Sequence, residues 1–261
     1  MERQQGACDS QSAAGPLLSL SSIGKRFGNV QALTDVNLDV QAGEVVGLLG
    51  DNGAGKSTLI KIISGVQSAT SGSLTIDGRV VRDLDPQKVR SLGIETIYQD
   101  LALAPNLDVA QNIFLGREIS TNILGILPKI RRREMHEHTQ EALQKLRIRI
   151  PSLYTQVGNL SGGQRQAVAI ARALFWQARL VIMDEPTAAL GVSEHEKVIE
   201  LVHDLAEQGV AVILVTHTMQ DALAVTDRIV VLAHGAKALE SPTADLDRTQ
   251  IVHAIMTGEA T

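Results

Sequence analysis

The sequence predicts an α/β fold with a parallel sheet, a β-rich N-terminal part and a helical middle part. Strands that alternate with helices after Leu160 indicate the parallel sheet, and the apolar run at 44–50 is typical of a strand buried on both faces. Short β-rich runs and turn signals over 16–46 predict antiparallel strands. The middle part, about 100–158, is patterned mainly as helix.

The individual elements follow from local patterns, taken in chain order. Residues 1–15 are rich in Ser, Gln and Gly and predict a disordered tail. Gly28 opens a predicted turn, and Asp77-Gly78 predicts the turn of a hairpin over 72–81. The remaining helices and strands are predicted at 56–66, 131–148, 161–175, 180–184, 193–208, 210–216 and 228–235.

Composition restricts the class of protein. Of the 261 residues, 44% are hydrophobic, which is enough for a sizeable core. The net charge of −5 and the 2% of aromatic residues argue against nucleic acid as the main partner. We interpret the run Arg131–Arg133 as a solvated helix start rather than a docking or phosphate-binding site. The single cysteine, Cys8, excludes an internal disulfide framework and is interpreted as an idle thiol in a reducing compartment.

The sequence also bears on the membrane. No window reaches the roughly 18 consecutive apolar residues of a membrane span, and the first residues lack the apolar core of a secretory signal. We therefore expect the chain to stay in the cytosol, so that any role at a membrane requires another protein to bring it there.

A glycine-rich loop follows the apolar run at 44–50 and matches the P-loop pattern, with a predicted helix after it. Its glycines let the backbone wrap a phosphate chain, and its N–H groups and the helix dipole face the negative charge. Lys56 is expected to reach the β- and γ-phosphates, and Ser57 to offer a hydroxyl to Mg²⁺. The loop comprises Gly50, Asp51, Asn52, Gly53, Ala54, Gly55, Lys56, Ser57 and Thr58.

Two further strand ends carry polar side chains. The run LVIMD ends in Asp184, which is expected to hold Mg²⁺ through water, and the next residue, Glu185, is expected to polarise an attacking water. His217 follows the run VAVILVT, so the ends of three strands would bring it to one edge with Lys56 and Glu185, where it could sense a γ-phosphate. The alternatives are solvated turn acids and a structural histidine.

A second anion site is predicted in the stretch LSGGQRQ. Ser161 is a good N-cap, and Gly162 and Gly163 leave the next N–H groups open at the positive end of a strong helix. A helical segment separates this stretch from the P-loop, so we expect it to serve the nucleotide of another subunit. Two copies, head to tail, would then sandwich two nucleotides.

Taken together, the chain resembles ATP-binding cassette (ABC) ATPases over nearly all of residues 16 to 258. The resemblance rests on an ordered set of motifs: GDNGAGKST, YQD, LSGGQRQ, LVIMDEPT and THTMQD. It implies a single domain over 16–258, a P-loop NTPase fold in which an N-terminal antiparallel β subdomain and a helical subdomain, about 100–165, join a RecA-like α/β core.

The resemblance also implies roles for individual residues. Phe27, which alone could be ordinary core, would stack on adenine. Gln99, which alone reads as a surface amide, would contact Mg²⁺ and link to a membrane partner. Glu185 would be the catalytic base and His217 the switch histidine. The residues implied in binding the partner chain's ATP are Ser161, Gly162, Gly163 and Gln164.

A finer resemblance points to the ATP-binding subunits of bacterial monosaccharide importers of the ribose, xylose and fructose type. It rests on ETIYQDLALAPNLDVAQNIFLGRE, TAALGVSE and MTGEA. Many of those chains fuse two cassettes, whereas this one has a single cassette and is expected to form a homodimer, with the sugar bound by a separate binding protein and the permease. One departure is Gly191, which stands where the family usually has an Asp that makes a contact across the dimer.

The expected function is therefore the ATP-hydrolysing motor of an importer, bound to its permease on the cytoplasmic side of the membrane through the segment from Gln99 to Arg117. Three alternatives remain open at this point. A soluble ABC ATPase for DNA or ribosomes would typically carry paired cassettes, coiled-coil insertions or zinc motifs. A P-loop kinase would not need the Ser161–Gln164 stretch. An ABC transporter for a different cargo would carry the same motifs, and only the subgroup resemblance weighs against it.

Overall fold

The computed structural model describes residues 15–123, 127–145, 150–188 and 190–259. Fourteen of the fifteen residues of the predicted disordered tail, including Cys8, lie outside the described residues, as do residues 146–149 at the end of the helix predicted over 131–148.

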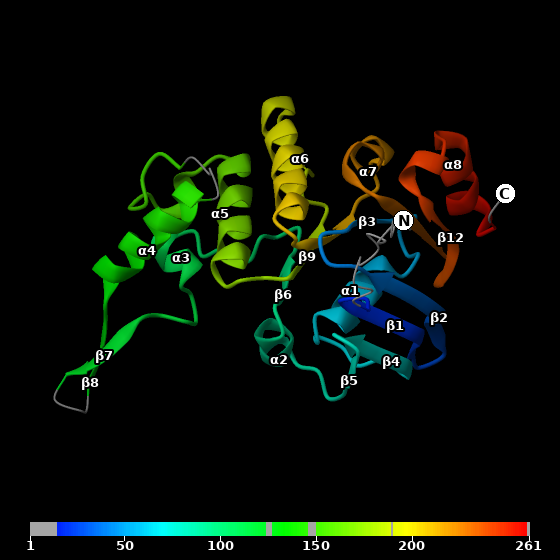
Figure 1. The fold of residues 1–261 in the computed structure, drawn as a ribbon, viewed down its shortest axis with the longest axis horizontal. Coiled ribbons are helices and arrows are strands. Elements are labelled where there is room, and N and C mark those ends of the chain that lie inside the picture. Colours follow the sequence, from blue (N-terminus) through cyan, green and yellow to red (C-terminus); the bar gives the residue numbers. More distant parts are fainter. Residues whose placement is uncertain (1–14, 124–126, 146–149, 189, 260–261) are drawn as a thin grey trace, which may run out of the picture.

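The α/β core is a six-stranded sheet in the order β12-β11-β3-β10-β9-β6 (Figure 1). Every pair is parallel except β11 with β12, which is antiparallel at the edge. This confirms the predicted parallel sheet. The strands are β3 (Val45–Leu49), β6 (Ile94–Ile97), β9 (Leu180–Asp184), β10 (Ala211–Val215), β11 (Arg228–Ala233) and β12 (Ala236–Pro242).

Successive residues of the central strands enter two different cores. In β9, Ile182 packs with the antiparallel sheet and α1 (Lys56–Ile63), whereas Val181 and Met183 pack beneath α5 (Gly162–Phe175) and α6 (Val192–Glu207). Burial on both faces explains why these strands show no polar alternation in the sequence.

The second sheet is antiparallel, in the order β2-β1-β4-β5, as the N-terminal pattern predicts. Asp77 and Gly78 both have positive φ, 48° and 72°, which is the type I′ geometry of a tight hairpin. The strands are β1 (Leu18–Phe27), β2 (Val30–Val40), β4 (Ser71–Ile76) and β5 (Arg79–Val81).

The middle part differs from the expected helical pattern. An antiparallel hairpin, β7 (Ser120–Ile123) with β8 (Leu127–Ile130), projects at one end of the molecule (Figure 1). Pro128 cannot sit in a helix interior and the preceding Ser, Thr and Ile favour extended backbone, so a strand pair forms where helix was expected. The described helices here are α3 (Val109–Ile113), α4 (Arg132–Lys145) and the 3₁₀ turn Val157–Asn159.

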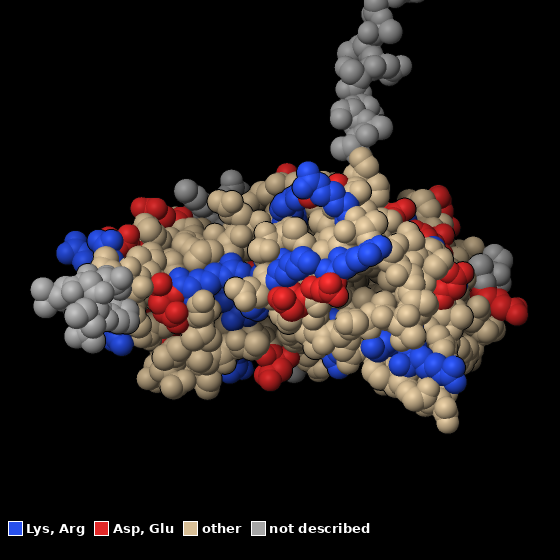
Figure 2. All heavy atoms as spheres, turned by 90° about the horizontal axis from the view of Figure 1, so that it is seen from below, with Lys and Arg blue, Asp and Glu red and all other residues tan. Residues whose placement is uncertain are grey.

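The remaining helices surround the two sheets. They are α2 (Pro86–Ser91), α7 (Met219–Val225), α8 (Arg248–Thr257) and the 3₁₀ turn Thr243–Asp245. Among the described residues, no helix has the length and apolar character needed to cross a membrane. Figure 2 shows Lys and Arg side chains interspersed with Asp and Glu over the face seen from below.

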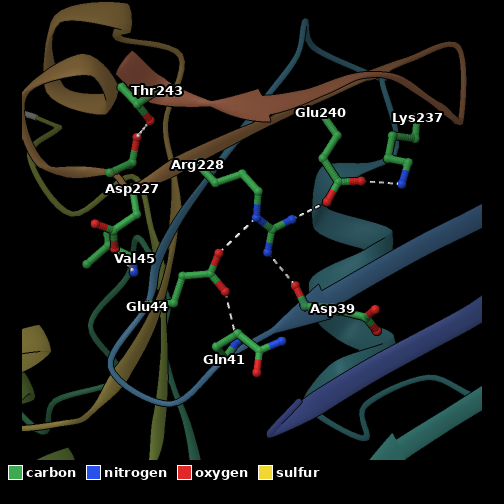
Figure 3. Close-up of polar contacts among 10 residues, drawn as sticks. Asp39, Gln41, Glu44, Val45, Asp227, Arg228, Lys237, Glu240 and Thr243 are labelled. Atoms are coloured by element: carbon green, nitrogen blue, oxygen red, sulfur yellow. Dashed lines mark hydrogen bonds and ion pairs between the residues drawn. The ribbon is translucent and has the colours of Figure 1, made fainter. Parts of the chain in front are cut away.

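Arg228, at the start of β11, joins the two sheets (Figure 3). Its guanidinium donates to Glu44 Oε1 at 2.8 Å, to Glu240 on β12, and to the Asp39 carbonyl of β2 at 2.6 Å. Arg228 and Glu44 are 18% and 14% exposed, so this junction is largely shielded from water.

Candidate active site

Four neighbouring strands place the sequence-predicted polar residues at one edge of the sheet. The P-loop follows β3, His217 lies two residues after β10, Glu185 follows β9, and Gln99 lies two residues after β6. Because β3, β10, β9 and β6 are adjacent and parallel, their carboxyl ends meet there. This is the edge where α/β sheets bind ligands.

Three glycines of the P-loop, Gly50, Gly53 and Gly55, have positive φ, and at Gly50 and Gly55 a Cβ would also collide with a neighbour. Gly50 has φ 149°, and a Cβ there would lie 2.3 Å from the Leu232 carbonyl oxygen. Gly55 has φ 107°, and a Cβ there would lie 2.6 Å from Leu33 Cδ2. Gly55 is also the N-cap of α1. The N–H groups of the loop therefore lie at the positive end of that helix, where an anion binds favourably.

Lys56 connects the P-loop to the acidic pair. Its ammonium group donates to the carbonyl oxygens of Gly50 at 2.6 Å and Asp51 at 3.1 Å. Burial lowers the pKa of Lys56, and the charges of Glu185 and Asp184 oppose that shift. Lys56 therefore lies within electrostatic reach of both carboxylates, at the edge where β3 and β9 end.

Asp184 and Glu185 are adjacent, but Asp184 has a shifted pKa and Glu185 has an unusual backbone conformation. Burial, then the charge of Glu185, raises the pKa of Asp184, and Lys56 opposes the shift. Glu185 has φ 52°, a left-handed conformation that costs about 1–3 kcal/mol for a non-glycine residue. Its N–H donates to the Val215 carbonyl at 2.8 Å, which fixes the turn against the end of β10.

His217 contacts Glu185 directly, with 2.8 Å between His217 Nδ1 and Glu185 Oε1. The Glu185 side chain is 16% exposed and the His217 side chain is 70% exposed. The histidine is therefore not a satisfied core residue. It stands between solvent and the carboxylate, where a third group entering the site would meet both side chains.

The oxygen donors at this edge suit a hard divalent cation. Ser57 supplies a hydroxyl, Asp184 a half-buried carboxylate, and Gln99 an exposed amide. Mg²⁺ prefers such oxygen ligands and usually retains several waters, so a partial set of protein donors is sufficient. The residues present therefore fit the predicted magnesium site, with Ser57, Asp184 and Gln99 as the side chains that would hold it.

Phe27 lies at the end of β1 with 45% of its surface exposed. The Lys25 ammonium group is 5.0 Å from the centre of its ring. The ring is therefore not part of the core, which excludes the interpretation of Phe27 as an ordinary core residue. Stacking of Phe27 on adenine stays a prediction.

The start of α5, where the sequence predicts a second anion site, has the predicted N-cap. Ser161 is the N-cap of α5, and a capping box joins it to Gln164: the Gln164 N–H donates to Ser161 Oγ at 3.3 Å, and the Ser161 N–H donates to Gln164 Oε1 at 3.0 Å. Gly162 and Gly163 form the first turn. Figure 1 shows α5 and α1 on opposite sides of β6 and β9, so this loop and the P-loop are separate in the single chain.

A buried network beside Glu185 was not predicted. Asp221 on α7 is 2% exposed and accepts a hydrogen bond from the Thr187 hydroxyl at 2.7 Å. Its other oxygen lies 2.8 Å from His195 Nε2 on α6. The network fixes the loop after Glu185 against the helix that follows His217. The only signal for this network in the sequence was Asp221, a single acidic residue on the apolar face of a short helix.

Gly191, the N-cap of α6, is not required by the backbone. Its φ is −71°, and an added Cβ would meet nothing within 4 Å. The fold therefore allows a side chain at this position, and the departure from the usual Asp has no local steric cause.

Comparison with known proteins gives consistent matches. Residues 33–188 match the family described as ABC transporter. The chain is 50% identical over 219 residues to the xylose/arabinose import ATP-binding protein of Sulfolobus acidocaldarius, covering 84% of this chain and 85% of that one. It is 40% identical to the fructose import ATP-binding protein of Rhizobium meliloti, covering 94% and 95%. A dimeric ATP-binding cassette bound to ADP and Pi superposes with a TM-score of 0.72 at 30% identity, covering 87% of this chain and 98% of that one.

Proposed function

Because this chain belongs to the ABC transporter family, we propose that it is the ATP-hydrolysing subunit of a monosaccharide importer. ATP is the nucleotide that the family binds. The observation that carries the proposal is the convergence of Lys56, Asp184, Glu185 and His217 at one sheet edge, directly beside the P-loop. The sugar class is supported by the names of the two relatives, which are similar over most of their length.

In the proposed site, the P-loop N–H groups hold the phosphates and Lys56 moves from its backbone acceptors to the β- and γ-phosphates. Mg²⁺, held by Ser57, Asp184 and Gln99, would neutralise charge on the phosphate oxygens. Glu185 accepts a hydrogen bond from the attacking water and orients it toward the γ-phosphate. His217, already at 2.8 Å from Glu185, contacts the γ-phosphate oxygens and makes hydrolysis depend on their presence.

The site is completed by a second copy of the chain. Ser161, Gly162, Gly163 and Gln164 would bind the γ-phosphate that lies on the partner's P-loop, using the positive end of α5. The separation of α5 from α1 supports this arrangement (Figure 1). The similarity to a dimeric cassette supports it independently. Two copies would close on two ATP molecules and open after hydrolysis removes the bridging phosphate.

Transport requires a membrane partner. We assign that contact to the segment from Gln99 to Arg117, which begins at the site and runs into the helical part of the molecule. Closure of the dimer would move this segment and with it a permease, which would hold the chain at the cytoplasmic face of the membrane. A separate binding protein would deliver the sugar on the other side.

The test uses a tagged Glu185→Gln chain, which should bind ATP, remain dimeric and lose hydrolysis. The chain is captured from gently solubilised membranes of its native cell with ATP and Mg²⁺, and the co-purifying proteins are identified by mass spectrometry. We expect a permease of the sugar type, with or without its binding protein. The matched control carries Lys56→Ala as well and should lose the ATP-dependent part of the capture.

Three results would overturn parts of the proposal. A permease for another class of cargo would overturn the sugar assignment. Capture of only soluble proteins or nucleic acid would overturn transport but leave the ATPase. Normal ATP turnover by Glu185→Gln would overturn the role of Glu185 as the base.

A further inference from the structure

Two side-chain hydrogen bonds join the segment after β9 to the segment after β10. The first is the contact of 2.8 Å between Glu185 Oε1 and His217 Nδ1. In the second, the Thr187 hydroxyl donates to Asp221 Oδ2 at 2.7 Å. Thr187 follows Glu185 by two residues, and Asp221 follows His217 by four, in the first turn of α7. The two bonds and the backbone between them therefore close a ring that contains both proposed groups of the hydrolytic site.

The backbone of Glu185 requires support from its neighbours. Its φ of 52° is a left-handed conformation, which a non-glycine residue keeps only where the surrounding structure holds it. Before the turn, the Glu185 N–H donates to the Val215 carbonyl at 2.8 Å, and the Ala188 N–H closes the turn on the Glu185 carbonyl at 3.2 Å. The bond from Thr187 to Asp221 holds the chain on the other side. The turn that carries Glu185 is thus fixed at both ends.

We propose that Asp221 is a positioning residue for ATP hydrolysis. Through Thr187 it holds the Glu185 carboxylate and the His217 imidazole in one arrangement toward the attacking water and the γ-phosphate. Asp221 is 2% exposed, so it acts through these neighbours and does not contact the nucleotide. The inference rests on the proposed function, which assigns the roles of Glu185 and His217.

A purely structural role would explain only one of the two bonds that Asp221 makes. Its Oδ1 lies 2.8 Å from His195 Nε2, and this contact ties α6 to α7. The bond with Thr187 does not join these helices, because it reaches the loop that follows Glu185. A buried carboxylate also carries a desolvation cost that an apolar side chain in the same helix would avoid. Holding the loop accounts for the second bond and for the carboxylate.

The test removes the bond to the loop and keeps the bond between the helices. Thr187→Val has nearly the same shape but lacks the hydroxyl, and Asp221 retains His195. We expect kcat for hydrolysis of ATP with Mg²⁺ to fall about tenfold, which corresponds to one hydrogen bond to a charged group. The KM for ATP should stay within about twofold, because the P-loop contacts are unchanged. Thr187→Ser restores the hydroxyl and should restore most of kcat.

The matched control is Thr139→Val. Thr139 lies on α4 and is fully buried, and its hydroxyl has no hydrogen-bond partner among the described residues. Figure 1 shows α4 and α7 on opposite sides of α6, so this variant makes the same chemical change away from the site. It should leave kcat unchanged.

A second measurement separates positioning from closure of the dimer. In a Glu185→Gln background, the ATP-dependent dimer is followed by analytical ultracentrifugation with and without Thr187→Val. We expect equal dimer formation, because the proposed role concerns the attacking water and not the binding of ATP. All rates are measured below the melting temperature of each variant, so that a loss of folded protein does not enter kcat.

The outcomes are distinct. If Thr187→Val lowers kcat no more than Thr139→Val, or raises only KM, the positioning role is overturned and the proposed function stands. A loss of kcat that Thr187→Ser does not restore, or that is matched by an equal loss of the dimer, also overturns the role. Normal turnover by Glu185→Gln alone would instead overturn the assignment of the base, and this inference with it.

Discussion

Replacing Arg228 by Met should destabilise the protein while leaving the ATP-binding residues in place. Methionine keeps an apolar stem of similar length but loses the three donors that join β11 to β2, to β12 and to Glu44, the residue before β3 (Figure 3). Burial opposes the charge of Arg228, but the hydrogen bonds that it donates to Glu44 and Glu240, together with the charges of these carboxylates, raise its pKa above the usual value. The guanidinium is thus a fully charged donor in a shielded position.

The contacts give the size of the effect. The bonds to Glu44 and to the Asp39 carbonyl are charge-assisted and largely shielded, and each is worth about 1.5 kcal/mol. The contact with Glu240, which is 29% exposed and also bound by Lys237, adds about 0.5 kcal/mol. The sum is about 3.5 kcal/mol, part of which arises because Glu44 is left without its cation.

Urea unfolding followed by circular dichroism measures this loss, and the melting temperature should fall by about 7–14 °C. Lys237→Met is the matched control, because it removes only the ion pair with Glu240 and should cost less than about 1 kcal/mol. A loss below 1 kcal/mol for Arg228→Met, or equal losses for the two variants, would refute the view that Arg228 joins the sheets.

Two further predictions concern single charges. Lys56→Ala should abolish nucleotide binding by the single chain, measured with a fluorescent ATP analogue, and undiminished affinity would contradict the assignment of the P-loop. Asp77 has its pKa lowered by hydrogen bonds from Arg179, whose nitrogens lie 2.5 and 2.6 Å from its two oxygens. Its contribution to stability is therefore present above the unfolded pKa of Asp and is lost as the pH falls through the lower folded pKa. Because both side chains are about half exposed, Asp77→Asn should cost under about 1 kcal/mol at neutral pH and nothing in strong acid, and a cost that persists in acid would contradict the sign.

The sequence predicts those parts of the site that depend on local pattern. An apolar strand followed by a glycine-rich loop or an acidic pair is visible in a few residues, and parallel strands then bring Lys56 and Glu185 to one edge. The β7–β8 hairpin was missed because the helical pattern around it was extended across Pro128. The buried network around Asp221 was missed for a different reason. Its contact with His195 exists only because α7 packs on α6, and no spacing in the chain encodes the packing of two helices that a strand separates.

The single chain satisfies each group proposed to bind the nucleotide with atoms of its own. Lys56 donates to P-loop carbonyls, Glu185 pairs with His217, and the Ser161 hydroxyl accepts a hydrogen bond from the Gln164 N–H. Exchanging one set of hydrogen bonds for another changes the free energy little, so the number of contacts to ATP does not by itself determine when the dimer closes. Charge separates binding from hydrolysis, because Lys56 gains phosphate charge when ATP binds to the single chain, whereas Glu185 acts on a water at the γ-phosphate. Each step should therefore respond to a different substitution: Lys56 for binding and Glu185 for hydrolysis.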